Sequence, residues 1–386
     1  MTAQILLPRI LEIGDGASLQ VATVLISLGF NKPLIITDNT MVKLGYVGPI
    51  QDCLHAENIS SKVFSNTEPE PTVASIEAAV HMATSDNFDC IIALGGGSPI
   101  DSAKAVSILA KFGGQMHEYK FPRIVNEAGL PIIAIPTTAG TGSEVTKFTI
   151  ITNQDTDEKM LCVGKGFMPV AALVDYSLTL SLPARTTADT GIDALTHAIE
   201  SYVSKKANPY SKSQSIAAIK LLAPNLRTVY EEPSNQKARE AMMLGATLAG
   251  IAFSNASVAL VHGMSRPIGA FFHVPHGLSN AMLLPSVTQY SIAGAVSLYA
   301  DCARAMGIAS TSDSDDDANH ALIAELYALN HDLSVPTLAE FGVDKAYFDS
   351  VVHTMAEQAL ASGSPSNNPI TPSVTDMVNI YERLWN

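Results

Sequence analysis

The sequence is poor in charged residues and lacks a long apolar run. Charged residues make up 16% of the 386 positions, and acidic residues outnumber basic ones to give a formal net charge of −14. Nucleic acids bind basic surfaces, so this balance argues against a nucleic-acid partner. No apolar run reaches the roughly 20 residues that a membrane-spanning helix needs. The start, MTAQILLPRILEIGDG, lacks the basic segment, apolar core and cleavage site of a secretory signal. We therefore expect no membrane partner.

Cysteine is also scarce, and two common nucleotide-binding motifs are missing. The four cysteines, at positions 53, 90, 162 and 302, are widely separated and form no CxxC pair. This spacing excludes a zinc ribbon and favours a reducing compartment, so a cytoplasmic location is expected. The chain has neither a GxGxxG fingerprint nor a GxxxxGK[ST] phosphate loop. A nucleotide site would have to be built from a different pattern.

Length and composition are sufficient for two domains with separate cores, since 47% of the residues are hydrophobic. Residues 1–182 alternate short apolar runs with helical patterns, which is typical of a parallel α/β sheet. From residue 183 onward the pattern is helical. The predicted fold class is α/β plus all-α: a Rossmann-like, parallel-sheet, nucleotide-binding domain (1–182) followed by an all-helical domain (183–386).

Apolar runs and helical periodicity predict individual elements within the first domain. Helices are expected at 17–29, 41–58, 72–86 and 98–110, and strands at 32–38, 89–94, 148–152, 161–163 and 171–178, with a further strand in LPIIAIP.

Two small-residue loops follow neighbouring predicted strands. In LGGGSPID, Gly95–Gly97 let backbone N–H groups approach a pyrophosphate, and the helix starting near Ser98 presents its positive end. An ordinary tight connection would show the same glycines. The second loop, TTAGTGSE, adds hydroxyl groups, and two such loops at the carboxyl ends of parallel strands form the crevice where nucleotides bind. The predicted cofactor contacts in these loops are Gly95, Gly96, Gly97, Ser98, Asp101, Thr137, Thr138, Thr141 and Ser143.

Asp38 ends an earlier predicted strand and is a candidate for binding the ribose of the cofactor. A carboxylate there accepts from a 2′-hydroxyl and repels a 2′-phosphate, which predicts NAD in preference to NADP. The following DNTMVK also makes Asp38 a candidate helix N-cap, and the two roles are compatible. Lys159 lies in the charged segment DTDEKM and would, on its own, be interpreted as a surface lysine.

Between Gly191 and Gly277 the chain carries four residues of metal-ligand type. Asp193 and His197 are four residues apart and therefore lie on one face of a helix, while His262 and His276 follow in VHGMSRPIGAFFHVPHG. One carboxylate and three imidazoles suit Fe²⁺ or Zn²⁺, whereas all-oxygen ligands would have indicated Mg²⁺ or Ca²⁺. The alternative is that these are ordinary helix histidines.

Taken together, GGGSPIDSAKA, PTTAGTGSEVT, D-x3-H at 193–197 and HGM…PHG at 262–277 resemble the iron-containing (group III) alcohol dehydrogenases. The resemblance covers essentially the whole chain. It implies a nucleotide-binding α/β domain, a helical metal-binding and catalytic domain of dehydroquinate-synthase-like architecture, and an active site in the cleft between them. It also implies an NAD-dependent alcohol dehydrogenase or aldehyde reductase acting on a small alcohol or aldehyde, and a homodimer or higher homo-oligomer.

The same resemblance implies roles for individual residues. The metal ligands would be Asp193, His197, His262 and His276, holding Fe²⁺ or, alternatively, Zn²⁺ or another divalent ion. Gly96, Gly97 and Ser98 would bind the pyrophosphate, Asp38 the adenosine ribose, and Thr137, Thr138, Thr141 and Lys159 other parts of the cofactor. Phe253 would line the substrate pocket. His273, three residues before a ligand, is a candidate proton relay; the alternative is that it supports a metal ligand or forms part of the pocket wall.

Two positions depart from the family pattern. Arg266 stands where many relatives have a second histidine, four residues after His262 and so on the same helix face. A guanidinium does not shuttle protons near neutral pH, but it can clamp an anionic substrate group; pairing with a nearby acid at the domain interface is the alternative. Glu70 replaces a frequent asparagine near the cofactor and would weaken or reroute one contact.

Other function classes remain to be separated. Dehydroquinate-synthase-like lyases and hydroxyacid-oxoacid transhydrogenases also combine a nucleotide and a metal in this architecture. A lyase needs several basic residues for a phosphorylated substrate, and the DALTHA and HGM…PHG segments fit the dehydrogenases better. A non-catalytic nucleotide-binding or metal-storage protein is a third hypothesis, which the combination of a ligand set and a nucleotide loop argues against.

Overall fold

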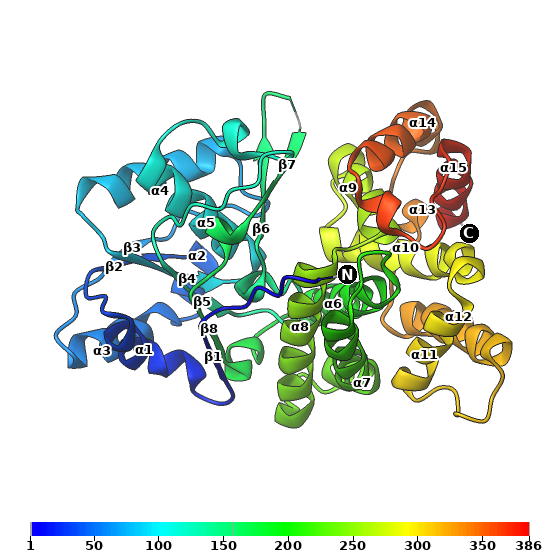
Figure 1. The fold of residues 1–386 in the computed structure, drawn as a ribbon, viewed down its shortest axis with the longest axis horizontal. Helices are drawn as coiled ribbons and strands as arrows, with labels where there is room; N and C mark the ends of the chain where they lie inside the picture. The colour runs from blue at the N-terminus through cyan, green and yellow to red at the C-terminus, as the bar shows by residue number, and fades with distance from the viewer. Residues whose placement is uncertain (1, 157, 386) are drawn as a thin grey trace. The chain divides into compact units, whose positions relative to one another are not determined.

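The computed structural model describes residues 2–156 and 158–385, which form two compact units (Figure 1). One unit spans Leu6–Ser181. The other consists of the chain from Leu182 onward together with the described residues before Leu6. The first unit is α/β and the second is helical, so the predicted fold class is confirmed.

A six-stranded sheet forms the centre of the first unit. Its strands are β1 (Ile10–Ile13), β2 (Pro33–Ile36), β3 (Lys62–Phe64), β4 (Cys90–Gly95), β5 (Ile132–Pro136) and β8 (Ala171–Val174). They lie in the order β1-β8-β5-β4-β2-β3, and each pairing is parallel. The central strands β2, β4 and β5 are buried along their whole length, which explains why they are rich in Ile, Leu and Ala and carry no charged residue.

Helices cover both faces of this sheet (Figure 1). They are α1 (Val21–Leu28), α2 (Asn39–Lys43), α3 (Val47–Ala56), α4 (Val73–Ser85) and α5 (Gly97–Phe112). Because side chains alternate along a strand, Leu34 and Ile36 pack into the core that contains α4 and α5, whereas Ile35 packs into the core that contains α1 and α3.

Two predictions for the first unit need correction. The helix expected over 41–58 is two helices, α2 and α3, because Gly45 between them has a φ of 79° that a continuing helix cannot adopt. The strands expected near 148–152 and 161–163 exist as β6 (Phe148–Asn153) and β7 (Glu158–Val163), but they form an antiparallel pair outside the main sheet.

The second unit consists of helices packed on one another. They are α6 (Ala184–Val203), α7 (Pro209–Glu231), α8 (Gln236–Ala256), α9 (Leu260–Phe272), α10 (His276–Ser291), α11 (Val296–Met306), α12 (Asp315–Asp332), α13 (Leu338–Phe341), α14 (Lys345–Ala361) and α15 (Val374–Glu382). Among the described residues, no single helix is long and apolar enough to cross a membrane. α8 and α9 would be long and apolar enough only as a pair, and this pair is bent by 102°.

Candidate metal centre and nucleotide-binding loops

Three helices of the second unit carry the four predicted metal ligands. Asp193 and His197 lie one turn apart on α6, and both are buried. His262 is the third residue of α9, and His276 is the first residue of α10. A connection of three residues links the end of α9 to the start of α10, and both helices contact α6.

The ligand atoms of three of these residues converge. One carboxylate oxygen of Asp193 and one ring nitrogen each of His262 and His276 lie within 4.8 Å of one another. Asp193 Oδ1 is 3.4 Å from His262 Nε2, 3.8 Å from His276 Nε2 and 3.9 Å from His197 Nδ1. The His197 ring stacks on that of His262, with centroids 4.4 Å apart. His276 keeps 40% of its side chain exposed, so the cluster is open on that side.

The electrostatics of this cluster keep Asp193 ionised. Burial acts to raise the pKa of its carboxyl, but the imidazoles of His197, His276 and His262 outweigh burial and hold the pKa far below its usual range. The pKa of His262 is raised to about 9: burial lowers it, and the hydrogen bonds to Asp193 and Glu200 more than offset that effect. The buried carboxylates of Asp193 and Glu200 therefore attract positive charge to this site, which a proton on His262 or a bound cation can supply.

The side-chain amide of Asn280 occupies the space between the ligand atoms and shows whether a cation would fit there. Its Nδ2 lies 2.7 Å from Asp193 Oδ1 and 3.2 Å from Nε2 of both His262 and His276. This amide donor thus lies among three atoms that can act as acceptors, which is the position where a cation would meet all of them. The Oδ1 of the same amide is buried without a hydrogen-bond partner among the described residues. The donor set and this arrangement fit a divalent ion.

Glu200 lies behind the ligands and was missed by the sequence reasoning. It is on α6, three residues after His197, and is only 3% exposed. Its Oε2 lies 2.6 Å from His262 Nδ1 and accepts from Ala259 N, and its Oε1 accepts from Val261 N. A D-x3-H-x2-E pattern on one helix was visible in the sequence, but nothing local linked Glu200 to His262.

The three residues predicted to contact substrate or relay protons lie in different surroundings. Phe253 of α8 is buried and stacks on His197, with ring centroids 4.2 Å apart. Arg266 lies one turn after His262 on α9 and is partly exposed. Its guanidinium makes no hydrogen bond or ion pair within residues 2–156 and 158–385; burial lowers its pKa, and the charge of Glu200 opposes that shift. His273 is exposed and ends α9 with a left-handed φ of 55°.

The two predicted nucleotide loops meet at the carboxyl end of the sheet in the first unit. Gly95 ends β4 with a φ of 147°, and a side chain there would collide with Pro99. Added Cβ atoms on Gly96 and Gly97 would meet Thr138 Cγ2 at 3.2 Å and Thr141 Cγ2 at 2.9 Å. Close packing of the threonine loop against the glycine turn therefore needs glycine at these positions. α5 begins at Gly97, so its first N–H groups and its positive dipole end lie at this turn.

Two predicted cofactor contacts, Asp101 and Ser143, are engaged within the protein. Asp101 accepts from the hydroxyl of Ser143 at 2.6 Å and from Ile150 N at 3.1 Å. The completely buried Lys104 donates to Ser143 Oγ, Thr146 Oγ1 and Phe148 O at 2.7–3.0 Å. Burial lowers the pKa of Lys104 to about 8, although Asp101 and Glu144 oppose this shift. The sequence reasoning missed Lys104; its position in the apolar stretch after the glycine turn was the available signal.

Three further cofactor candidates, Asp38, Lys159 and Ser98, also have partners in the first unit. Asp38 caps α2 through Oδ1, which accepts from Thr40 N and Met41 N. Lys159 belongs to β7 and forms an ion pair of 3.0 Å with Glu70. The backbone N–H of Glu70 in turn donates to Ser98 Oγ at 3.2 Å. The two positions that the sequence treated separately, Glu70 and Lys159, are therefore joined beside the glycine turn.

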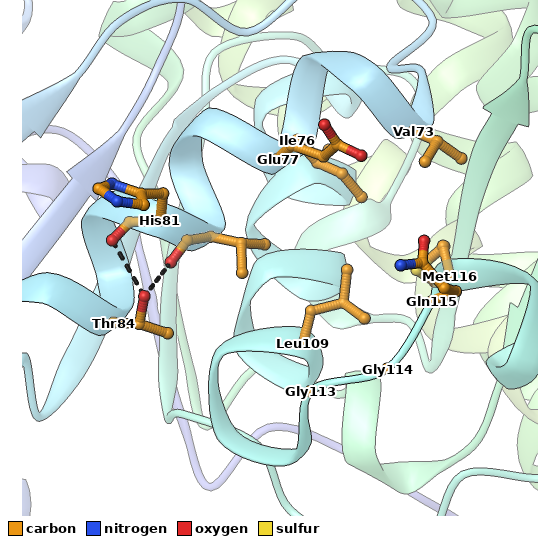
Figure 2. A pocket seen from close by; sticks show the side chains of 11 residues that line it. Val73, Ile76, Glu77, His81, Thr84, Leu109, Gly113, Gly114, Gln115 and Met116 are labelled. Atoms are coloured by element: carbon orange, nitrogen blue, oxygen red, sulfur yellow. Dashed lines mark hydrogen bonds between the residues drawn. The ribbon is translucent and has the colours of Figure 1, made fainter.

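A cavity of about 330 Å³ lies elsewhere in the first unit (Figure 2). It is lined by residues of α4, such as Ile76 and His81, by Leu109 near the end of α5, and by residues 113–116 after that helix. The glycine turn is at the other end of α5, and a helix of this length extends over roughly 24 Å. None of the predicted site residues lines this cavity.

Two family models together match nearly the whole chain. The model for iron-containing alcohol dehydrogenase matches residues 8–176, and the model for the C-terminal part of the Fe-containing alcohol dehydrogenase family matches residues 187–385. The chain belongs to the iron-containing alcohol dehydrogenase family.

Similar proteins within this family are oxidoreductases by name. Long-chain-alcohol dehydrogenase 1 of Geobacillus thermodenitrificans is 38% identical, with 99% of this chain and 97% of that protein covered. Lactaldehyde reductase of Escherichia coli is 35% identical, with 92% and 93% covered. Among solved structures, a 1,3-propanediol oxidoreductase is 34% identical with a TM-score of 0.95, both chains being covered completely. Sulfoacetaldehyde reductase from Bifidobacterium kashiwanohense, solved in complex with NAD⁺, is 26% identical with a TM-score of 0.89, over 100% of this chain and 99% of that one.

This iron-containing alcohol dehydrogenase family member is therefore an enzyme that oxidises alcohols or reduces aldehydes. The convergence of Asp193, His262 and His276 within one unit is a site in which a divalent ion fits.

Proposed function

We propose that this protein is an NAD-dependent, divalent-metal-dependent alcohol dehydrogenase or aldehyde reductase, with Fe²⁺ as the expected ion and Zn²⁺ or another divalent ion as the alternative. The observation that carries the proposal is the convergence of Asp193 Oδ1 with Nε2 of His262 and His276 around a single donor, Asn280 Nδ2. His197, next to Asp193, is the fourth proposed ligand.

At the metal centre, the proposed role of these side chains is to hold the ion, and a bound divalent ion supplies Lewis-acid polarisation of the substrate oxygen. Asp193 contributes the negative charge, and its buried position strengthens that attraction. Phe253, stacked on His197, would form an apolar wall that excludes water. His273 is exposed at the turn before His276, where its imidazole can exchange a proton with solvent.

At the nucleotide loops, the proposed ligand is NAD, which supplies the hydride acceptor. The first N–H groups of α5, from Gly97 onward, and the hydroxyl of Ser98 are suited to its diphosphate. Thr137, Thr138 and Thr141 offer further hydroxyls, and the Thr137 hydroxyl is buried without a hydrogen-bond partner among the described residues. Both recorded bonds of Asp38 use Oδ1, which leaves Oδ2 for a ribose hydroxyl and disfavours a 2′-phosphate.

The test is formation of NADH from NAD⁺ and a small primary alcohol by protein with a defined metal content. We expect NADH and the oxidised product to accumulate in equal amounts. NADH formation should cease when a chelator removes the metal, and it should resume when Fe²⁺ or Zn²⁺ is added. A His262→Ala variant should resist this restoration. A lyase or a transhydrogenase would not accumulate NADH, and a chelated protein with full activity would overturn the metal assignment.

Arg266 supports a narrower proposal, that the substrate carries an anionic group. Its guanidinium is on the same helix face as His262, and within the described residues no carboxylate forms an ion pair with it. A guanidinium in this setting favours a carboxylate, sulfonate or phosphonate, which it can bind in bidentate fashion. One structural relative is named for an anionic aldehyde, sulfoacetaldehyde, and others are named for neutral substrates.

The comparison that tests this proposal uses one anionic and one neutral aldehyde of similar length. We expect kcat/KM to favour the anionic aldehyde in the wild type and to lose that preference by about tenfold or more in Arg266→Ala. Arg266→Lys keeps the charge and should retain part of the preference. An unchanged preference in Arg266→Ala would eliminate the proposal and leave the dehydrogenase assignment intact.

We further propose a homodimer or higher homo-oligomer in the cytoplasm. β1 is an edge strand of the sheet; Ile13 at its end exposes 44% of its surface, and Leu7, which precedes the strand, exposes 42%. Exposed strand edges with apolar side chains are sites of pairing with another chain. All four cysteines are free thiols, which supports a reducing compartment. Sedimentation of the wild type against an Ile13→Lys variant tests the oligomer.

A further inference from the structure

Glu200 connects two of the three helices that carry the converging ligands, α6 and α9. It belongs to α6, as Asp193 does, and its three hydrogen-bond partners are His262 and the two backbone N–H groups of Ala259 and Val261 at the start of α9. The carboxylate is 3% exposed, and its distances to these partners are 2.5–3.0 Å. A buried carboxylate with this many donors is held in one orientation.

The contact with His262 determines which ring nitrogen faces the metal centre. A carboxylate only accepts hydrogen bonds, so His262 Nδ1 donates to Glu200 and carries a hydrogen. On the other side of the ring, Nε2 lies 3.2 Å from the amide nitrogen of Asn280, which only donates. Both contacts agree with a ring that keeps its hydrogen on Nδ1 and can offer the Nε2 lone pair to a cation held beside Asp193 and His276.

The contacts with backbone N–H groups fix where α9 begins. The first N–H groups of a helix have no partner within that helix, and they mark its positive end. Glu200 accepts from Ala259 N and Val261 N, so α6 holds the start of α9 through the same carboxylate that orients His262. The distance of 3.4 Å between Asp193 Oδ1 and His262 Nε2 therefore depends on Glu200 as well as on helix packing.

We propose that Glu200 is a positioning residue of the metal centre, which presents His262 Nε2 as a ligand by holding Nδ1–H and the first turn of α9. The proposal rests on the metal centre described under the proposed function. Loss of a carboxylate that orients a metal-binding histidine typically weakens metal affinity by about 10–100-fold.

The experiment measures Zn²⁺ affinity of the full-length protein by competition with a chromophoric chelator. Glu200→Gln cannot satisfy the same donors, because its NH₂ group must face either a backbone N–H or His262 Nδ1. Glu200→Asp keeps the charge and shortens the reach. We expect affinity to fall in the order wild type, Glu200→Asp, Glu200→Gln, with about a 10–100-fold loss in the last. Thr196→Val is the matched control, since Thr196 is buried on α6 and, within the described residues, its hydroxyl donates to Ile192 O alone.

Further measurements separate positioning from general destabilisation. Nitrogen-15 spectra of histidine-labelled protein should show His262 protonated at Nδ1 in the wild type and altered in Glu200→Gln. If Glu200→Gln does not fold, the comparison of Glu200→Asp with Thr196→Val decides the question. Equal Zn²⁺ affinity in the wild type, Glu200→Asp and Thr196→Val would overturn the positioning role. A wild type that binds no Zn²⁺ would instead overturn the metal centre itself.

Discussion

In the helical unit the candidate ligand atoms belong to side chains, Asp193 Oδ1 and Nε2 of His262 and His276, whereas in the sheet unit many of them are backbone N–H groups at the start of α5. Each group of candidate ligand atoms is held in place by buried charged residues. Glu200 holds His262, and Lys104 with Asp101 holds the loop at Ser143. A side-chain site depends on a few residue types, and a backbone site depends on the conformation that buried neighbours impose.

The largest expected effect is at the side-chain site. Asp193→Asn removes the negative charge that attracts the ion, so we expect metal content near zero and a loss of kcat/KM on the order of 1,000-fold or more, since a metal contributes several kcal/mol to such reactions. Metal analysis and steady-state kinetics measure both quantities. Asp189→Asn, one turn earlier on α6, is the control, and its metal content should match the wild type.

A second expected effect is on stability, at the residue behind the backbone site. Lys104→Met leaves Asp101 buried without its nearby cation and three acceptors without their donor. Removing one partner of a buried pair costs about 3–5 kcal/mol, which denaturant unfolding measures. We also expect a raised Kd for NADH, because the threonine loop loses its anchor. Wild-type stability together with wild-type NADH affinity would contradict the role assigned to Lys104.

The pH dependence of stability provides a separate measure of Lys104. Its pKa in the folded protein is about 8, below the ordinary value of 10.5, so the unfolded chain binds more protons between these two values. The contribution of this lysine to the unfolding free energy should therefore rise as the pH increases from about 8 to about 10.5. Lys104→Met should lack that rise. Unfolding curves of both proteins over this range test the difference, and parallel pH profiles would exclude it.

A smaller effect is expected on cofactor choice. Asp38→Asn retains a side-chain oxygen that caps α2 but removes the charge that repels a 2′-phosphate. We expect the ratio of kcat/KM for NADP to that for NAD to rise by about tenfold, which corresponds to about 1.4 kcal/mol. Asp38→Ala should show the same change in preference with additional loss of stability. A constant ratio in both variants would argue that Asp38 serves only as the helix cap.

The smallest effect is expected at the exposed ion pair beside the glycine turn. Glu70→Gln releases Lys159, and pairs of this exposure contribute about 0–1 kcal/mol. NADH affinity should increase by no more than about fivefold, because Lys159 becomes available to the cofactor phosphates. The increase should disappear at high salt, where such charges are screened. Weaker binding in Glu70→Gln would show that Glu70 itself contacts the cofactor.

The parallel sheet, the helical second unit and the two loops could be predicted from the sequence, because buried strands and helix faces leave local patterns of apolar residues. The helix expected over 41–58 was wrong because the left-handed φ of Gly45 divides it, and the composition around that glycine did not reveal its conformation. The pairing of β6 with β7 outside the main sheet depends on contacts that a single strand pattern does not carry.

For the site, the sequence by itself determined the residue types: the Asp-x3-His spacing on one helix, the two later histidines, and the glycine turn followed by a threonine loop. Tertiary structure decided which charged residues, far away in the sequence, contact the site residues. Glu200 and His262 are 62 positions apart, and Glu70 and Lys159 are 89 apart, yet each pair is in contact. Their distances are set by how α6 packs on α9 and how β7 approaches the glycine turn. A local pattern can specify a ligand, but only packing brings a buried charge to the residue that it orients.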